Sequence, residues 1–110
     1  MWGDGEQTRS FCHIDDCVEG IYRLMQSDYA QPLNLGTERM VSINELAAII
    51  MSIAGKTLSV EHVEGPEGVR GRNSDNTRLR EVLGWEPSID LEEGLAETYR
   101  WIEKQLLERQ

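Results

Sequence analysis

The sequence has few of the residues that hold very small secreted or metal-dependent domains together. Its 110 residues include only two cysteines, three prolines and one phenylalanine. Two cysteines are too few for a disulfide framework, and Cys12 and Cys17 lack metal-ligand spacing with either His13 or His62. We therefore expect both thiols to be free in a reducing cytoplasm, and we predict no metal site.

Basic residues are also scarce. There are 11 Lys and Arg residues against 20 Asp and Glu residues, and the formal net charge is −9. This balance argues against nonspecific binding to nucleic acid or to an anionic membrane, because both need a basic face. No apolar run approaches the length of a membrane span, and residues 1–5 lack the basic start and apolar segment of a signal peptide. We expect a cytoplasmic protein with neither a nucleic acid nor a membrane as a partner.

Motifs for catalysis and cofactor binding are missing as well. No Gly-x-Gly-x-x-Gly lies between a predicted strand and a predicted helix, so nothing in the sequence indicates a dinucleotide-binding turn. His13 and His62 form no Ser/His/Asp or Cys/His constellation, and we interpret both as structural. Paired acids such as Asp15 and Asp16 are typical of helix starts, where carboxylates stabilise the helix dipole. The sequence predicts no catalytic residue.

Apolar residues recur at helical spacing in four segments, so the sequence predicts four helices. Capping boxes at Asp16–Glu19 and Ser42–Glu45 begin the first two helices, Asp90 and Glu93 cap the last, and Gly55 and Gly84 end the second and third. The predicted buried stripes are Val18, Ile21, Tyr22 and Met25; Leu46, Ile49, Ile50 and Ile53; Leu79, Val82 and Leu83; and Leu91, Leu95, Tyr99, Ile102 and Leu106.

Extended segments are expected at residues 8–14, 33–35 and 58–63. Three short strands separated by helices do not readily close a sheet of their own. The sequence therefore predicts a helix-rich α/β fragment of a larger fold.

The charge balance reverses in one stretch, the segment Gly65–Asn76, which we call the arginine loop, together with the helix that follows it. The arginines of this stretch are Arg70, Arg72, Arg78 and Arg80. Guanidinium groups in a glycine-rich loop beside a helix start are suited to binding phosphate oxygens. A solvated loop with surface arginines is the alternative, and composition alone favours that alternative.

Five motifs cover nearly the whole chain in order. They are Trp-Gly-Asp-Gly-x-Gln-Thr-Arg-Ser-Phe at 2–11, Ile-Asp-Asp-Cys-Val-Glu-Gly at 14–20, Pro-Leu-Asn-Leu-Gly at 32–36, the arginine loop, and Leu-Gly-Trp-x-Pro at 83–87. Together they resemble the C-terminal part of the NAD-dependent nucleotide-sugar epimerases and dehydratases, which are extended short-chain dehydrogenases/reductases. The first and fourth motifs are most similar to members that act on GDP-sugars. The resemblance implies that residues 1–110 form a single nucleotide-sugar-binding domain and that the Rossmann core is mostly absent.

The resemblance also implies which residues bind the substrate. Gln7, Thr8 and Arg9 would contact the nucleotide diphosphate, and Arg72, with Arg70 beside it, would contact the phosphates. The family's glycine-rich NAD loop, its Tyr-x-x-x-Lys pair and the acid/base cysteine of the GDP-sugar members would all lie upstream of this sequence. We therefore expect a GDP-sugar ligand, NAD bound only in the parent family, and no turnover by these 110 residues alone.

A different function stays open at this point. The chain could be a stand-alone, non-enzymatic module that binds a nucleotide or another protein. In either case its strand edges and apolar helix faces would lack neighbours, so we expect a homodimer.

Overall fold

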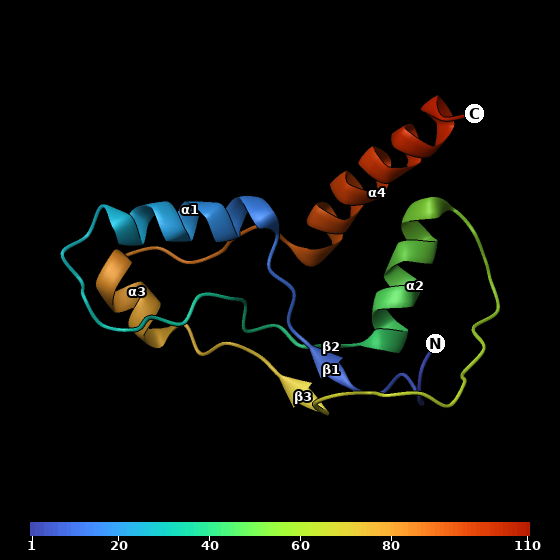
Figure 1. Cartoon of the computed structure of the whole chain (residues 1–110), viewed down its shortest axis with the longest axis horizontal. Coiled ribbons are helices and arrows are strands. Elements are labelled where there is room, and N and C mark those ends of the chain that lie inside the picture. The colour runs from blue at the N-terminus through green and yellow to red at the C-terminus, as the bar shows by residue number, and fades with distance from the viewer.

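Four helices form close to the positions that the sequence predicts. The computed structural model describes residues 1–110 and contains α1 (Ile14–Met25), α2 (Ile43–Ala54), α3 (Thr77–Leu83) and α4 (Leu91–Glu108). Figure 1 shows α1 and α3 toward one end of an elongated molecule and α2 and α4 toward the other, with a small sheet between them. No helix has the length and apolar character needed to cross a membrane.

The helix ends show which capping predictions hold. The Ser42 hydroxyl accepts a hydrogen bond from the Glu45 amide at 3.0 Å, and Gly55 ends α2 at a φ of 64°, so the predicted cap and stop of α2 are confirmed. The predicted cap of α4 is absent, because the Asp90 side chain forms no capping hydrogen bond. The prediction for α1 was also wrong. His13 caps this helix through Nδ1, which accepts from the Asp15 amide at 3.1 Å, and this leaves Asp16 free for a different contact.

Three two-residue strands form the sheet in the order β2–β1–β3. They are β1 (Thr8–Arg9), β2 (Val41–Ser42) and β3 (Gly71–Arg72). Strand β1 pairs antiparallel with β2 and parallel with β3. A side chain at Gly71 would place its Cβ only 2.9 Å from Thr8 Oγ1, so glycine permits the close approach of β3 to β1.

Two of the three predicted strands are absent. Residues 33–35 have no strand beside them, and residues 58–63 pair only through one isolated bridge between Val63 and Trp2. Alternating apolar residues become a strand only when a neighbouring strand supplies hydrogen-bond partners. Here the neighbouring strands are missing, because only Met1 and Gly3 form backbone hydrogen bonds with the 58–63 segment.

The chain buries very little apolar surface. Val41 and Leu79 are the only hydrophobic residues that are buried. The radius of gyration is 16.7 Å, whereas a compact domain of this length has about 13 Å. The accessible surface is 7937 Å², compared with about 6,200 Å² for a compact protein of this mass. The four helices are therefore arranged around an open shape and not around a closed core.

Helix α1 shows most clearly that apolar side chains are left uncovered in this open shape. Its apolar stripe was predicted to be buried, but Val18, Ile21, Tyr22 and Met25 are between 50% and 74% exposed. Ile14 continues the same stripe and is also exposed, and we call these five residues the outer face of α1. The same correction applies to the end of α4, where Ile102 and Leu106 are exposed. Helical spacing predicts which side of a helix is apolar, but another element must be present to cover it.

The opposite side of α1, which we call its inner face, holds the helix to the rest of the chain. Gly20 is buried, and a Cβ there would lie 2.6 Å from a Leu35 methyl group and 3.0 Å from the Trp85 ring. The Asp16 carboxylate is 6% exposed and accepts from the amides of Ser88 at 3.0 Å and Ile89 at 2.9 Å. The inner face thus packs through a glycine and one buried carboxylate.

Candidate functional site

The pairing of β1 with β3 places two arginines side by side. Arg9 and Arg72 are register partners on parallel strands, so their side chains leave the sheet at the same level. Both line a groove of about 520 Å³, which we call the arginine groove. Its other lining residues are Ser10, Cys12, Asn34, Leu35, Gly36, Thr37, Asn73 and Ser74.

The charges of these two arginines are not neutralised within the chain. Arg9 donates from Nη1 to the Thr8 carbonyl at 2.7 Å and from Nη2 to the Glu67 carbonyl at 3.5 Å, so its only partners are neutral. Arg72 is exposed and forms no ion pair. Two guanidinium groups without a carboxylate are a natural anion site, because each offers several donors in a planar fork.

Arg70 has quite different surroundings, although it comes from the same loop. Its guanidinium donates to both oxygens of Asp4 at 3.0 Å and lies 3.4 Å from a Glu67 oxygen. The bond from Arg70, supported by the Glu6 amide, lowers the pKa of Asp4 to about 2. Arg70 therefore ties the arginine loop to the N-terminal turn, and it does not line the groove.

Gln7 and Thr8 support the strands rather than the groove. The Gln7 carbonyl accepts from the Ile43 amide at 3.1 Å, and the Thr8 amide donates to the Arg70 carbonyl at 2.9 Å. The side-chain oxygen Oε1 of Gln7 is buried and has no hydrogen-bond partner. Of the five residues predicted to bind substrate, the structure brings only Arg9 and Arg72 together at one cavity.

Some groove residues were missed in the sequence. Asn73 and Ser74 belong to an Asn-Ser-Asp-Asn run in the arginine loop, and neither was predicted to bind substrate. The Asn73 side chain donates to the Glu38 carbonyl at 3.1 Å, and the Ser74 hydroxyl donates to Asn76 Oδ1 at 2.8 Å. The polar run was a usable signal, since amide and hydroxyl groups next to arginines are common in anion sites. Asn34 gave no such signal, because it was assigned to a strand.

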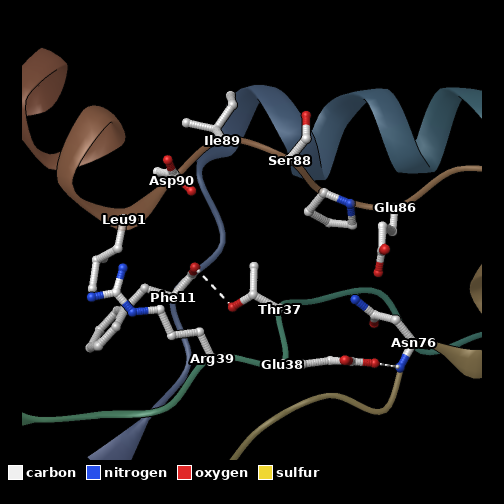
Figure 2. A pocket seen from close by; sticks show the side chains of 11 residues that line it. Phe11, Thr37, Glu38, Arg39, Asn76, Glu86, Ser88, Ile89, Asp90 and Leu91 are labelled. Atoms are coloured by element: carbon white, nitrogen blue, oxygen red, sulfur yellow. Dashed lines mark hydrogen bonds between the residues drawn. The ribbon is translucent and has the colours of Figure 1, made fainter.

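A second groove, of about 300 Å³, lies between the 86–91 segment, which leads into α4, and residues 37–39, with Phe11 and Asn76 also lining it (Figure 2). Three of its four charged side chains, those of Glu38, Arg39 and Glu86, already have partners. Arg39 donates to both Glu92 oxygens at 2.7 Å, which lowers the pKa of Glu92 to about 2. Glu38 accepts from the Asn76 amide at 2.9 Å and from Arg80 at 3.0 Å, and these bonds lower the pKa of Glu38. We interpret this groove as structural.

One cluster has the residue types of a metal site. His13 lies 3.8 Å from an Asp15 oxygen and 3.8 Å from a Glu97 oxygen. The nitrogen near Asp15 is Nδ1, which already accepts the Asp15 amide, so the two carboxylates face different ring nitrogens. One ligand atom from each residue lies within 4.8 Å of the others, but Asp15 and Glu97 are exposed, and exposed acidic groups are common without an ion. Because His13 Nδ1 already caps α1, we interpret the cluster as part of that cap.

The cysteines lack the surroundings of a nucleophile. Burial, with the nearby Cys17 and Asp16, raises the pKa of the Cys12 thiol. A reactive cysteine needs the opposite shift, because the thiolate is the nucleophile.

Sequence relatives were found along almost the entire chain. A profile of the GDP-mannose 4,6 dehydratase family matches residues 1–98. GDP-mannose 3,5-epimerase 1 of Oryza sativa subsp. indica is 57% identical over 106 residues, which are 96% of this chain and 28% of the relative. UDP-glucuronic acid decarboxylase 5 of Arabidopsis thaliana is 41% identical over 92 residues, which are 83% of this chain and 27% of the relative. The chain thus spans little more than a quarter of the length of these curated relatives.

Solved structures of nucleotide-sugar epimerases contain the same arrangement. UDP-glucose 4-epimerase from Thermotoga maritima, crystallised with UDP-glucose, superimposes with a TM-score of 0.91 and 34% identity over 96% of this chain and 35% of that chain. UDP-glucuronic acid 4-epimerase from Bacillus cereus, in complex with UDP-glucuronic acid and NAD, gives a TM-score of 0.88 and 26% identity over the same shares. The predicted fold class, a helix-rich portion of an extended short-chain dehydrogenase/reductase, is therefore confirmed.

A family profile over residues 1–98 and a relative 57% identical over 96% of the chain lead to one assignment. This chain belongs to the GDP-mannose 4,6 dehydratase family of NAD-dependent nucleotide-sugar epimerases and dehydratases, and it corresponds to about a quarter of its curated relatives' length.

Proposed function

We propose that this chain is the substrate-binding, C-terminal portion of a GDP-mannose 3,5-epimerase-like enzyme. In this role it supplies contacts to the diphosphate of a GDP-sugar and no catalytic residue. The observation that carries the proposal is the register pairing of Arg9 with Arg72 in a groove where neither arginine has a carboxylate partner. The 57% identity to a GDP-mannose 3,5-epimerase supports a GDP-sugar as the ligand.

The groove chemistry suits a diphosphate. A diphosphate offers pairs of oxygens that two planar guanidinium groups can engage at the same time. Ser10, Asn73 and Ser74 add neutral polar groups on the same wall. Arg70 was also predicted to touch the phosphates, but its bonds to Asp4 compete with that role.

NAD does not fit the residues of this chain. A dinucleotide site of this family needs a strand, a glycine-rich turn and a helix in succession. The arginine loop instead follows a segment without strand structure and contains β3. Hydride chemistry therefore falls outside these 110 residues, and we expect no turnover of GDP-mannose when they are purified and supplied with NAD. The free thiols suit the reducing cytoplasm in which we expect the protein.

A chemical-shift titration with GDP tests the proposal, with guanosine as the uncharged control. Each charge-assisted contact is worth about 1.5–3 kcal/mol, so Arg72→Ala should weaken GDP binding roughly 10- to 100-fold. Arg72→Lys keeps the charge but loses the fork and should also weaken GDP. Arg78→Lys, on α3 and away from the groove, is the matched control and should change little. Equal responses to GDP and guanosine, or an Arg72→Lys protein that binds like the parent, would contradict the proposal.

The second candidate is a stand-alone binding module that pairs with another copy of itself. The small number of buried apolar side chains favours this possibility, because a chain with little core gains stability by association. A homodimer through uncovered strand edges was predicted from the sequence, and light scattering measures it directly. The mass of one chain at high concentration would reject this candidate.

A further inference from the structure

We propose that Arg70 keeps Arg9 available for an anion by holding the carboxylate of Glu67, and that Arg70 is therefore a positioning residue of the arginine groove. The inference rests on the proposed function, because it concerns how strongly the same site binds its ligand. Arg9 lines the groove and Arg70 does not. Glu67 connects the two arginines, since its backbone contacts Arg9 and its side chain contacts Arg70.

The backbone at Glu67 lies directly beside the Arg9 guanidinium. The Glu67 carbonyl accepts a hydrogen bond from Arg9 Nη2 at 3.5 Å. The next residue, Gly68, has a φ of 74°, and a Cβ built there would lie 3.6 Å from the same nitrogen. A glutamate carboxylate is joined to its own backbone by a few single bonds, so rotation about them brings it toward groups that contact that backbone. Arg9 is such a group.

In the folded chain the Glu67 carboxylate is held elsewhere. Its Oε2 lies 3.4 Å from Arg70 Nη1, and its Oε1 accepts from the Asp4 amide at 3.3 Å. Arg70 is itself fixed, because it donates to both Asp4 oxygens at 3.0 Å. The Asp4 carboxylate also accepts from the Glu6 amide at 2.9 Å, which keeps it in its own turn. Glu67 is therefore the acid that is free to change partners when Arg70 is removed.

Loss of Arg70 would set up a competition for Arg9. The Glu67 carboxylate would lose its only cationic partner, while Arg9 is a nearby guanidinium whose present partners are neutral. The Glu67 side chain is only 34% exposed, so water screens its charge less than that of a fully exposed acid. A diphosphate would then have to displace this carboxylate before it engaged Arg9. Arg70 prevents the competition without touching the ligand.

Two other roles for Arg70 predict different behaviour. If Arg70 contacted the phosphates directly, its removal would weaken binding whether or not residue 67 carried a charge. If Arg70 only fastened the arginine loop to the N-terminal turn, removal of the Glu67 charge would not refasten it. Only a competing carboxylate predicts that a second substitution, at Glu67, restores the binding that the first substitution removes.

The experiment is a chemical-shift titration of the 110-residue chain with GDP. Arg70→Gln should raise the Kd for GDP roughly 3- to 5-fold, the size expected when a partly exposed ion pair must be broken. The double variant Arg70→Gln with Glu67→Gln should return to within about twofold of the parent, because the competing charge is gone. Arg70→Met takes the place of Arg70→Gln if the latter does not fold. Circular dichroism checks that all variants keep the helix content of the parent.

Arg39→Gln is the matched control. Arg39 is 53% exposed against 59% for Arg70, and it likewise binds both oxygens of one carboxylate, that of Glu92, at 2.7 Å. This variant removes the same charge and frees an acid, but neither Arg39 nor Glu92 lines the arginine groove. We expect the Kd for GDP to change by less than about twofold.

A second readout needs no ligand. The side-chain N–H proton signals of Arg9 should move downfield in Arg70→Gln, because a carboxylate forms a stronger, charge-assisted hydrogen bond than a carbonyl does. The signals should return to their parent positions in the double variant. Arg9 signals that stay in place in Arg70→Gln would show that Glu67 does not change partners.

The outcomes separate this inference from the proposed function. A parent without a GDP response, in which the Arg9 signals move as expected on loss of Arg70, rejects only the proposed function. A parent that binds GDP while Arg70→Gln binds it equally well overturns only the role of Arg70. A double variant that binds GDP as weakly as Arg70→Gln alone overturns that role too, because the loss would then have a cause other than the Glu67 charge.

Discussion

The two faces of α1 reverse the arrangement that is usual for a helix at the surface of a small domain. The inner face is buried through Gly20 and the carboxylate of Asp16, whereas the outer face exposes Val18, Tyr22 and Met25. A polar group is buried at little cost only when its hydrogen bonds are formed, and Asp16 has two. The exposure of the apolar side chains on the outer face is not explained by any contact within this chain. The difference indicates that the inner face stabilises the chain itself and that the outer face belongs to a larger assembly.

Among the tests of this comparison, removal of the Asp16 side chain should lower the free energy of unfolding the most. Asp16→Ala leaves the Ser88 and Ile89 amides without an acceptor, and we expect the free energy of unfolding to fall by about 3 kcal/mol. Urea denaturation followed by circular dichroism measures the change. Asp28→Ala removes an exposed acid beyond the end of α1 and should change the free energy by less than about 0.5 kcal/mol. Similar losses in both variants would mean that the inner face is not the stabilising one.

A side chain at Gly20 should have the next largest effect. Gly20→Val pushes new methyl groups against Leu35 and Trp85, and overpacking of this kind costs roughly 1–3 kcal/mol. Ala48→Val introduces the same β-branched residue at an exposed position of α2, where it meets no packed side chain, and is the control for overpacking. The urea midpoint should fall clearly more for Gly20→Val. Equal midpoints would show that α1 can move away from Leu35 without loss.

The exposed ion pairs should contribute the least to stability, and the loss of their contribution should be visible only at acidic pH. Asp4 and Glu92 have pKa values of about 2 in the folded chain, below the ordinary values of 3.8 and 4.5, because Arg70 and Arg39 bind them. A carboxyl whose pKa is lowered on folding stabilises the protein above its ordinary pKa, and that stabilisation is lost as the pH falls through the folded value. The urea midpoint should therefore drop between about pH 4.5 and pH 2.

Arg70→Gln should reduce that acid dependence, because Asp4 loses its partner. Arg100→Gln is the control, because Arg100 lies on α4 and forms no ion pair. Its urea midpoint should fall with decreasing pH as steeply as that of the parent. Because neither pair includes a residue of α1, the acid response should be unchanged in Gly20→Val. A parent protein whose midpoint is flat from pH 5 to pH 2 would contradict the role of these pairs.

Part of the fold could be predicted from local chemistry. The cap by Ser42 and the left-handed glycines at Gly55 and Gly84 depend on neighbours within a few residues, so the sequence indicates them directly. The family motifs were equally visible, and the comparisons confirm that assignment. The strands at 33–35 and 58–63 were wrong because strand formation depends on a partner that the local sequence does not contain.

The candidate site likewise has residues that the sequence predicts and an arrangement that it does not predict. Arg72 could be proposed from the arginine loop and Arg9 from the family motif, yet no spacing rule joins residues 63 positions apart in the chain. The pairing of β1 with β3 brings them together, and the salt bridge to Asp4 separates Arg70 from them. Arg70 and Arg72 have the same charge and the same loop, so composition could not distinguish them.

The sequence by itself determined the four helices, their ends at Gly55 and Gly84, the acidic balance and the family, because each depends on residue type and short-range spacing. Tertiary structure alone decided which apolar stripe is covered, which segments become strands and which arginines share a groove. These properties depend on what lies across from a residue in space. Nothing in this chain covers the outer face of α1.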